Sequence, residues 1–325
     1  MKAFQYAEAA TGLQLKELPV PEPGPDEVLI KIRAAGMCHT DCHIIEGTSD
    51  DWIKKRPITL GHEVAGEVVK AGANVADLFG RGDRVAVCQV CQPYAKRDWL
   101  KSIGLGFDGG YAEYSAVPAS RLKRIPDNVS FAQAAVAMDA LATSYEAIMV
   151  GGVKKGSTVG IVGIGGLGMS GVAFAAIEGA EVYGFDLDTS KFEEAKALGA
   201  RACFKSLPEA EGVAFDMILD FVGIEKTIGA ACSSVKPTGT VVVIGLASTS
   251  VSVPIQKMLF NSITLKGSMG ASEETAERVL ELLEKGSIKP SLVEVPFQAI
   301  PSTLKRLADG AKTEGRYWTD PSKAA

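Results

Sequence analysis

Apolar residues fall in short runs through the first 130 positions of the chain. The runs at residues 28–33, 64–70 and 84–87 are separated by Gly, Pro and Asp, which is typical of strands joined by turns. Alternate prolines at residues 19–25 exclude a helix there, because proline interrupts the helical hydrogen-bond ladder. We therefore expect the first part of the chain to be rich in β-structure.

The pattern changes after residue 131. Residues 132–150 contain neither Gly nor Pro and are rich in Ala, which predicts a helix. Strand-like and helix-like segments then alternate, and the pattern predicts strands at 158–162, 181–185, 215–219 and 240–245 and helices at 167–177, 190–198 and 273–283. This alternation is typical of an α/β fold with a doubly wound parallel sheet.

The composition is that of an ordinary globular protein. A length of 325 residues favours about two domains. The 34 basic and 39 acidic residues give a formal charge of −5, which disfavours a nucleic-acid partner. The chain has neither an apolar run near the ~18 residues of a membrane span nor the apolar segment of a secretory signal. Six cysteines are too few for a disulfide scaffold. We expect a cytoplasmic protein that needs no membrane and keeps its thiols free or metal-bound.

A glycine-rich motif follows the strand expected at 158–162. Gly163, Gly165 and Gly168 form G-x-G-x-x-G at the start of the next helix, where glycines allow close approach to a pyrophosphate and the helix supplies amide donors. Asp186, 23 residues after Gly163, ends the next strand. A carboxylate there accepts hydrogen bonds from the ribose hydroxyls and repels a 2′-phosphate. The motif predicts NAD rather than NADP. FAD, or a glycine-rich turn that binds no nucleotide, is the alternative.

Possible metal ligands are concentrated in a short stretch. Residues 38–43 read Cys-His-Thr-Asp-Cys-His, and all three histidines of the chain lie between positions 39 and 62. A single histidine is more often a hydrogen-bonded structural residue, but chance rarely gathers every histidine of a chain in this way. Thiolate with imidazole is a donor set that suits zinc. The stretch therefore predicts a zinc site.

Five segments carry a resemblance to a known family. They are GMCHTD at 36–41, GHEVAGEV at 61–68, GDRV at 82–85, GGYAEY at 109–114 and the glycine-rich motif. Together they resemble the medium-chain dehydrogenase/reductase superfamily, specifically its zinc-dependent alcohol dehydrogenases. The string GHE-x-x-G-x-V is the most specific of these signatures.

The resemblance implies an α/β protein of two domains. Residues 1–141 and 269–325 would form a GroES-like, β-rich catalytic domain, and residues 142–268 a Rossmann domain that binds NAD. Members of the family form dimers and tetramers through edge strands of the Rossmann domain, here 240–245 and 263–266. A homodimer or homotetramer is therefore expected.

The resemblance also assigns a metal site. Cys38 and His62 look like zinc ligands, Glu63 like a transient ligand, and Asp41 like the carboxylate that orients His62. The third ligand of the family is commonly a Cys in the helix before the Rossmann domain, where this chain has Asp139. Carboxylate oxygen is an acceptable zinc donor. An unpaired carboxylate among Ala, Met and Leu would be costly, so we expect a ligand rather than a surface residue.

Cofactor contacts follow from the same resemblance. Thr143 and Leu167 are expected to contact the nicotinamide of NAD. Lys191 and Asp186 are expected to contact its adenosine ribose, and His39 and Arg316 its pyrophosphate. The complete set of expected contacts is His39, Thr143, Gly163, Gly165, Gly166, Leu167, Gly168, Asp186, Lys191, Gly245 and Arg316.

Proton transfer and substrate binding complete the expected site. Thr40 and His43 resemble the relay that carries the proton of the alcohol to solvent. Trp52 and Gln89 are expected to line the substrate pocket, with ordinary core packing as the alternative for Trp52.

One departure from the family concerns the lobe that carries a structural zinc on four cysteines. Only Cys88 and Cys91 lie in the corresponding segment, and two thiolates cannot complete a four-coordinate site. We expect one catalytic zinc per chain and no structural zinc. These cysteines would line or support the active-site cleft, and a redox pair is the alternative.

The implied function is reversible hydride transfer between a small-molecule alcohol and NAD, which gives an aldehyde or ketone. One alternative is a zinc-free quinone or enoyl reductase of the same superfamily, which the ligand set and Asp186 disfavour. The other is a non-enzymatic nucleotide-binding protein on this fold, which the relay residues disfavour. The identity of the alcohol and the physiological direction stay open.

Overall fold

The structure is a computed structural model that describes residues 1–324. The chain divides into two compact units, Met1–Ala142 with Ala271–Ala325 and Thr143–Gly270. Each unit has its own sheet structure and its own cluster of buried apolar side chains. In the described part of the chain, every helix is too short or too polar to cross a bilayer.

The first unit is built on mainly antiparallel strands. A small sheet has the order β2-β1-β4, and a larger sheet has the order β15-β16-β3-β5-β6-β8, with β7 paired to β3. The strands are β1 (Lys2–Tyr6), β2 (Leu13–Glu17), β3 (Glu27–Gly36), β4 (Ile58–Thr59), β5 (Glu63–Ala71), β6 (Arg84–Val87), β7 (Tyr114–Pro118), β8 (Leu122–Arg124), β15 (Leu292–Glu294) and β16 (Arg316–Thr319). Strands from both ends of the chain therefore share one sheet.

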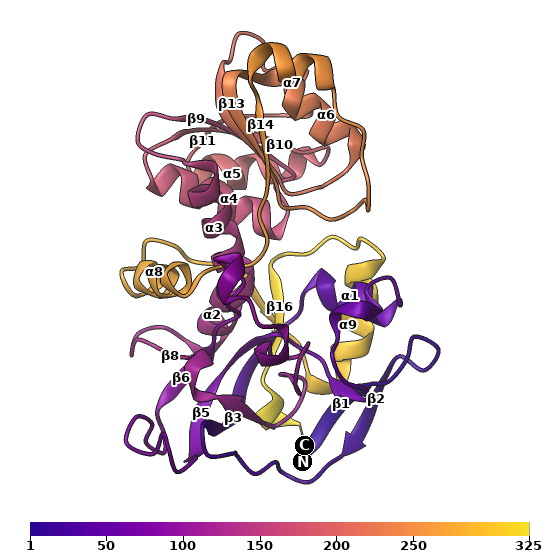
Figure 1. The fold of residues 1–325 in the computed structure, drawn as a ribbon, viewed down its shortest axis with the longest axis vertical. Coiled ribbons are helices and arrows are strands. Elements are labelled where there is room, and N and C mark those ends of the chain that lie inside the picture. The colour runs from indigo at the N-terminus through magenta and orange to yellow at the C-terminus, as the bar shows by residue number, and fades with distance from the viewer. Residues whose placement is uncertain (325) are drawn as a thin grey trace. The chain divides into compact units, whose positions relative to one another are not determined.

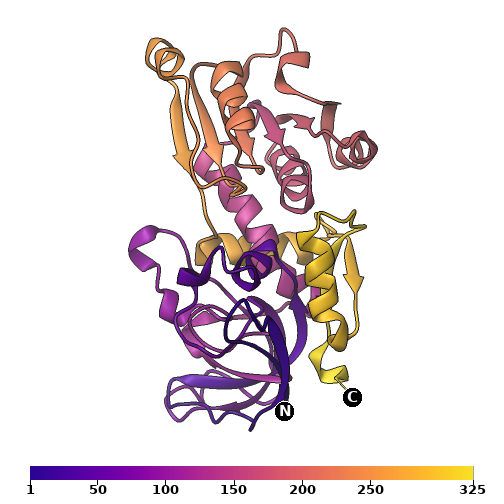
Figure 2. The ribbon, with the colours of Figure 1, turned by 90° about the vertical axis from the view of Figure 1, so that its right-hand side faces the viewer.

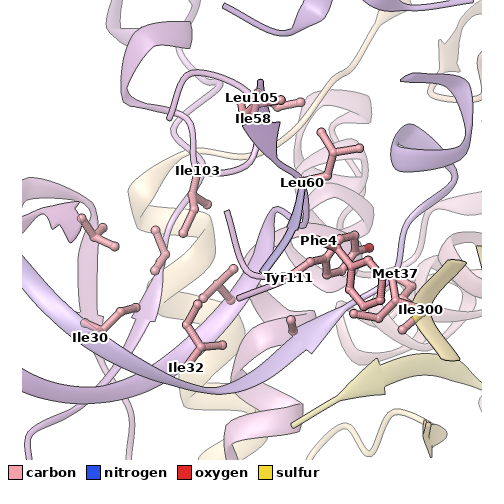
Figure 3. Close-up of a cluster of buried hydrophobic side chains, with 14 of the residues drawn as sticks. Phe4, Ile30, Ile32, Met37, Ile58, Leu60, Ile103, Leu105, Tyr111 and Ile300 are labelled. Atoms are coloured by element: carbon pink, nitrogen blue, oxygen red, sulfur yellow. The ribbon is translucent and has the colours of Figure 1, made fainter. Parts of the chain in front are cut away.

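The core of this unit lies on the inner faces of these strands. On β3, Ile30 and Ile32 are fully buried, whereas Lys31 and Arg33, which alternate with them, are half-buried, as the alternation of a strand requires. Figure 3 shows these isoleucines in one cluster of buried side chains that also contains Tyr111. This core fixes the strand ends that carry the site described below.

The α-helices of the first unit flank its sheets. They are α1 (His39–Ile45), α2 (Phe131–Val136), α8 (Glu273–Glu284) and α9 (Ile300–Ala308). Helices α1 and α9 lie side by side (Figure 1), and the Cys42 thiol of α1 is 3.4 Å from the Leu304 carbonyl oxygen of α9. The chain ends also meet, because Nζ of Lys2 donates to the Ala324 carbonyl over 2.6 Å.

The second unit is a parallel sheet with the order β11-β10-β9-β12-β13-β14. Its strands are β9 (Thr158–Val162), β10 (Glu181–Phe185), β11 (Ala200–Phe204), β12 (Phe215–Asp220), β13 (Val235–Val243) and β14 (Thr264–Gly267). Its helices, which pack beside the strands (Figure 2), are α3 (Ala142–Gly151), α4 (Gly166–Ile177), α5 (Phe192–Ala197), α6 (Glu225–Ser234) and α7 (Ile255–Asn261). Strand β9 lies between β10 and β12, so the strand order reverses there. In doubly wound sheets, ligands bind at the carboxyl ends of the strands at this reversal.

The strand and the helix predicted at 240–245 and 190–198, both in the second unit, differ from the structure. The strand expected at 240–245 is β13, which begins earlier and ends before residue 244, because the N–H groups of Ile244 and Gly245 both donate to the Asp220 carbonyl and turn the chain. The helix expected at 190–198 is a 3₁₀ turn, η6 (Thr189–Lys191), followed by α5. The turn is tight because the side chain of Asp188 accepts from the Ser190 N–H.

Candidate catalytic metal site

Cys38 lies where β3 gives way to α1. It is the N-cap residue of α1, and its N–H donates to Oδ2 of Asp41 in the first helical turn over 3.3 Å. An acidic residue in this turn also suits the positive end of the helix dipole. Gly36, at the end of β3, is required because a Cβ there would overlap the Glu63 carboxylate. The local sequence thus places the thiol beside the start of β5.

His62 and Glu63 lie at the start of β5, which pairs with β3. Gly61 before them has a φ of +92°, a left-handed conformation that glycine adopts readily, and a Cβ there would lie 2.7 Å from the Tyr111 ring. His62 and Glu63 are both buried, with exposed fractions of 3% and 0%. The signature string therefore encodes a tight turn that brings an imidazole and a carboxylate into the interior.

Asp139 lies in a π-helical turn. The helix expected at 132–150 divides into α2, a π-helical segment η5 (Ala137–Leu141), and α3. A π turn holds one more residue than an α-helical turn and is frequent at functional sites. The neighbours Met138 and Ala140 are buried. The turn thus carries a carboxylate within an otherwise apolar stretch.

The donor atoms of Cys38, His62 and Asp139 lie within 4.8 Å of one another, and this is the one such group of three or more found within residues 1–324. Nε2 of His62 is 3.6 Å from Oδ2 of Asp139. Tetrahedral zinc with bonds of about 2.0–2.3 Å needs ligand atoms about 3.3–3.8 Å apart. The residues present therefore fit a zinc ion and leave one coordination position for another ligand.

Carboxylates dominate the electrostatics of this group. Burial acts to lower the pKa of His62, but the charge of Asp41 and hydrogen bonding to Asp139 outweigh it and raise that pKa well above its usual value. Burial acts to raise the pKa of Asp139, but His62 and Arg316 hold it below its usual range. Negative charge is thus in excess around a buried imidazole, and a divalent cation would neutralise that excess.

Asp41 lies behind His62. Its carboxylate is fully buried, and Oδ1 is 3.3 Å from Nδ1 of His62, the ring nitrogen that does not face Asp139. Oδ2 accepts a 2.7 Å hydrogen bond from the hydroxyl of Tyr111. Sequence reasoning missed Tyr111, which served only as one letter of a family motif. Tyr111 and Asp41 are 70 residues apart in the chain, so no local pattern in the sequence signalled this contact.

Glu63 and Arg316 form a buried ion pair. Nε of Arg316 donates to Oε2 over 3.1 Å, Nη2 donates to Oε1, and Nη2 is also 3.6 Å from Oδ2 of Asp139. Burial raises the pKa of Glu63 to about 7; the positive Arg316 opposes this rise and the negative Asp139 adds to it. In this structure Arg316 contacts the expected metal ligands. Its pyrophosphate contact stays a prediction.

The expected relay residues lie on α1. Thr40 is half-buried, and its Oγ1 is 3.7 Å from the Cys38 thiol. His43 lies three residues later on the same helix and is also half-buried. His39, the first residue of the helix, is exposed.

The two expected pocket residues have different surroundings. Gln89 is buried, and its side-chain amide donates to the carbonyl of Ile103 over 3.0 Å and to that of His62 over 3.5 Å. The amide therefore supports the backbone of an expected zinc ligand. Trp52 ends a 3₁₀ turn, η1 (Asp50–Trp52), and is half-buried.

The segment of Cys88 and Cys91 is held by an arginine. Both thiols are buried, and burial raises the pKa of Cys88 to about 12. Nε of Arg97 donates to the Cys91 carbonyl over 3.0 Å. The guanidinium lies 5.0 Å from the ring centre of Tyr94 and 5.6 Å from that of Trp99, within range of cation–π attraction.

In the second unit, the glycine-rich motif joins β9 to α4. Gly163 has a φ of +82°, and a Cβ at Gly168 would overlap the carbonyl oxygen of Gly163. A Cβ at Gly165 or Gly166 would meet no described atom within 4 Å. The turn is therefore tight on its inner side and open on its outer side, as a pyrophosphate site requires.

Asp186 follows β10. Its Oδ1 accepts from the Asp188 N–H over 2.9 Å, and its Oδ2 pairs with Nζ of Lys191 at 3.1 Å. Two of the expected ribose-binding side chains therefore contact each other at the carboxyl end of the strand.

The remaining expected cofactor contacts lie on other elements of this unit. Thr143 is buried on α3, and the carbonyl of Leu167 on α4 accepts from the Ser144 hydroxyl over 2.9 Å. Gly245 follows β13, where a Cβ would overlap the backbone of Val222. A packing constraint thus explains this glycine without a ligand.

Comparisons with known proteins identify the family of the chain. Residues 24–127 match the alcohol dehydrogenase GroES-like domain, and residues 166–285 match the zinc-binding dehydrogenase domain. The chain is 33% identical to an alcohol dehydrogenase of Geobacillus stearothermophilus, over 97% of this chain and 98% of the relative. The chain belongs to the zinc-dependent alcohol dehydrogenase family.

Other relatives narrow the chemistry. An NAD-dependent alcohol dehydrogenase of Saccharolobus solfataricus is 30% identical, over 90% of this chain and 92% of the relative. The fold is similar to that of acetophenone reductase from Geotrichum candidum, solved in complex with NAD, with a TM-score of 0.90 and 30% sequence identity. The match covers 100% of this chain and 98% of the reductase chain. This alcohol dehydrogenase is thus an NAD-dependent, zinc-type enzyme with Zn²⁺ and NAD(H) as cofactors and a small-molecule substrate. The predicted family, fold class and activity are confirmed.

Proposed function

We propose that this alcohol dehydrogenase binds its zinc ion through Cys38, His62 and Asp139, with Glu63 as a transient ligand. The observation that carries the proposal is the approach of the three donor atoms within 4.8 Å of one another. Three protein ligands leave a fourth position for substrate or water, as in catalytic zinc sites. When bound, the zinc ion supplies a Lewis acid at the substrate oxygen, and NAD supplies the hydride acceptor.

Alcohol oxidation releases one proton for each hydride transferred, and we assign its path to α1. The Thr40 hydroxyl is 3.7 Å from the Cys38 thiol, so it lies beside the proposed ligand set and can accept the proton of a substrate hydroxyl. His43 lies on the same face of the helix, one turn later, and is half-buried. It can therefore receive the proton from Thr40 and release it to solvent.

The nucleotide roles are assigned to the second unit. The motif from Gly163 to Gly168 would hold the pyrophosphate, because its outer side is open and lies at the N-terminus of α4. Asp186 would accept from the adenosine ribose, with Lys191 beside it at 3.1 Å. Trp52 and Gln89 remain the proposed pocket residues in the first unit.

We also propose that the enzyme is a homodimer or homotetramer. Strand β14 is an edge strand whose four residues are all exposed, so its backbone is available to pair with another copy. Leu259 and Phe260 of the adjacent α7 are 71% and 79% exposed, which is unusual for apolar side chains on a monomer. Leu265→Lys on β14 should shift the enzyme to a smaller species in analytical ultracentrifugation. A wild type that sediments as a monomer would contradict the proposal.

The test of the proposed function begins with the wild type. NAD-linked turnover is measured over primary, secondary, benzylic and polyol alcohols, together with zinc by elemental analysis. Turnover that requires bound zinc supports the proposal, and full turnover by metal-free protein would contradict it.

Thr40→Val tests the proton path. We expect a loss of alcohol oxidation of about 10²-fold or more, with zinc and NAD still bound. Thr48→Val is the matched control, because the Thr48 hydroxyl bonds the carbonyl of His43 at the far end of α1 (3.0 Å) and has no assigned role in proton transfer. An active Thr40→Val enzyme would place the proton path elsewhere. His43→Gln should be milder, because water can replace the outer member of a relay.

A further inference from the structure

Tyr111 is fixed between the N-terminal strand and the turn that carries His62. Its N–H donates to the Leu60 carbonyl over 3.0 Å, and its carbonyl accepts from the Phe4 N–H over 2.8 Å. The side chain is fully buried in the cluster shown in Figure 3, and the ring occupies the space that a Cβ at Gly61 would need. The position of the phenol oxygen is therefore set by the core.

The phenol has two neighbours, and both can only accept a hydrogen bond. Asp41 Oδ2 lies 2.7 Å away and the Gly36 carbonyl oxygen 3.3 Å away. The hydroxyl has one proton, so it must donate, and the shorter distance and the negative charge favour the carboxylate. Burial and the charge of Asp41 raise the pKa of Tyr111 well above its usual value, which keeps this proton in place.

Asp41 depends on this donor more than on its others. The carboxylate is fully buried, and its two backbone donors, the N–H groups of Cys38 and Gly61, are 3.3 Å and 3.4 Å away. These are long hydrogen bonds, whereas the bond from Tyr111 has the length of a strong charge-assisted bond. A buried carboxylate that loses its best donor loses orientation as well as stability.

We propose that Tyr111 is a positioning residue that holds Asp41 against Nδ1 of His62 and thereby sets the affinity of the site for zinc. Asp41 Oδ1 is 3.3 Å from Nδ1, so the negative charge of a fixed carboxylate favours a proton on that nitrogen, and Nε2, which faces Asp139, is the nitrogen left to bind zinc. The inference rests on the proposed zinc ligands. It adds a core tyrosine, two residues removed from the metal, to the groups that determine metal binding.

The experiment compares Tyr111→Phe with Tyr6→Phe. Tyr6 is also fully buried in the first unit and donates its hydroxyl to a carboxylate, Asp50, over 2.8 Å. Asp50 pairs with Arg56 and not with the zinc ligands, so the control removes the same kind of bond outside the site. Zinc-loaded enzyme is titrated with a chelator of known affinity, and the visible spectrum of the cobalt-substituted enzyme is recorded.

Tyr111→Phe should raise the zinc dissociation constant about 10–100-fold and alter the cobalt spectrum, the usual scale for losing a group that orients a ligand. Tyr6→Phe should change neither. Thermal unfolding of the zinc-free proteins separates a loss of fold from a loss of metal affinity. Unchanged zinc affinity in Tyr111→Phe, or an equal change in Tyr6→Phe, would overturn the inference.

A double-mutant cycle provides a second measurement. If Tyr111 acts through the carboxylate, Tyr111→Phe should change zinc affinity less than about twofold in an Asp41→Asn background. An undiminished effect there would overturn the inference while leaving the proposed ligands intact. Wild-type enzyme that binds no zinc at all would instead overturn the proposed site, and this inference with it.

Discussion

Nε2 of His62 and Oδ2 of Asp139 are 3.6 Å apart, although the two residues lie on different elements of the first unit. His62 directly precedes β5, and Asp139 belongs to the π-helical turn η5. An imidazole and a carboxylate attract each other when the imidazole is protonated, and a metal ion that both of them bind can take the place of that proton.

The first prediction concerns Asp139. Asp139→Cys should keep zinc and part of the activity, because thiolate is also a zinc donor. Asp139→Ala should lose zinc, since Arg316 already engages the Glu63 carboxylate that would have to replace it. Elemental analysis of both variants and of the wild type is the measurement. The wild type should hold one zinc per chain, and two would show that the segment around Cys88 and Cys91 binds metal.

The second prediction concerns the ion pair of Glu63 and Arg316. At about pH 9, where the Glu63 carboxylate of the wild type is ionised, Arg316→Met leaves this fully buried group without its bidentate partner and should lower the free energy of unfolding by about 3–5 kcal/mol. Adding Glu63→Gln should restore most of this loss, because the uncompensated charge is gone. Urea unfolding of the zinc-free proteins measures both. If Arg316→Met alone is as stable as the wild type, the ion pair contributes nothing to the free energy of unfolding.

The third prediction concerns cofactor choice. The wild type should use NAD at least tenfold better than NADP, because the Asp186 carboxylate repels a 2′-phosphate. Asp186→Ser should narrow this preference for NAD because it removes the repulsion of the 2′-phosphate. It also frees the Lys191 ammonium, now 3.1 Å from the carboxylate, to pair with that phosphate. Steady-state kinetics with both cofactors decide the matter, with Asp188→Ser in the same loop as the control. Equal use by the wild type would contradict the role of Asp186.

The fourth prediction follows from the buried thiol of Cys88. Burial raises its pKa to about 12, so the reactive thiolate is scarce at pH 8 and its fraction grows about tenfold per pH unit up to that value. Alkylation of Cys88 by iodoacetamide should therefore still accelerate between pH 9 and 11, where an ordinary cysteine (pKa about 8.5) has levelled off. Mass spectrometry of the modified peptide gives the rate. A plateau near pH 9 would show that the thiol is reached by solvent.

Local signals in the sequence were sufficient for the part of the second unit that runs from β9 to Asp186. The strands β9 and β10, the glycine-rich motif and Asp186 follow one another along the chain, and each is defined by its own few residues. Hydrophobic periodicity and glycine spacing therefore predicted them directly. The predicted end of β13 was wrong, because the chain turns where the N–H groups of Ile244 and Gly245 donate to the carbonyl of Asp220, a residue of the neighbouring strand β12.

Long-range contacts determine what the sequence could not show. Arg316 reaches Glu63 because β16 pairs with β3, which also carries Gly36 opposite Glu63. The Tyr111 hydroxyl bonds to Asp41 although the two residues are 70 positions apart, because the fold packs their segments together in the core. Neither contact leaves a local pattern. The π-helical turn also escaped, since its residues are as apolar and as helix-prone as those of an ordinary helix.

The π-helical turn makes the site tolerant of one kind of genetic change and intolerant of another. A point mutation at codon 139 that replaces one metal donor by another leaves the position of the ligand unchanged. Deletion of any single codon from 137 to 141 would instead close the turn into a regular α-helix, in which each residue advances by about 100°. The residues that remain in the turn, Asp139 among them, would then change the direction they face. The identity of this ligand can therefore vary among descendants of the gene, whereas the length of the segment cannot.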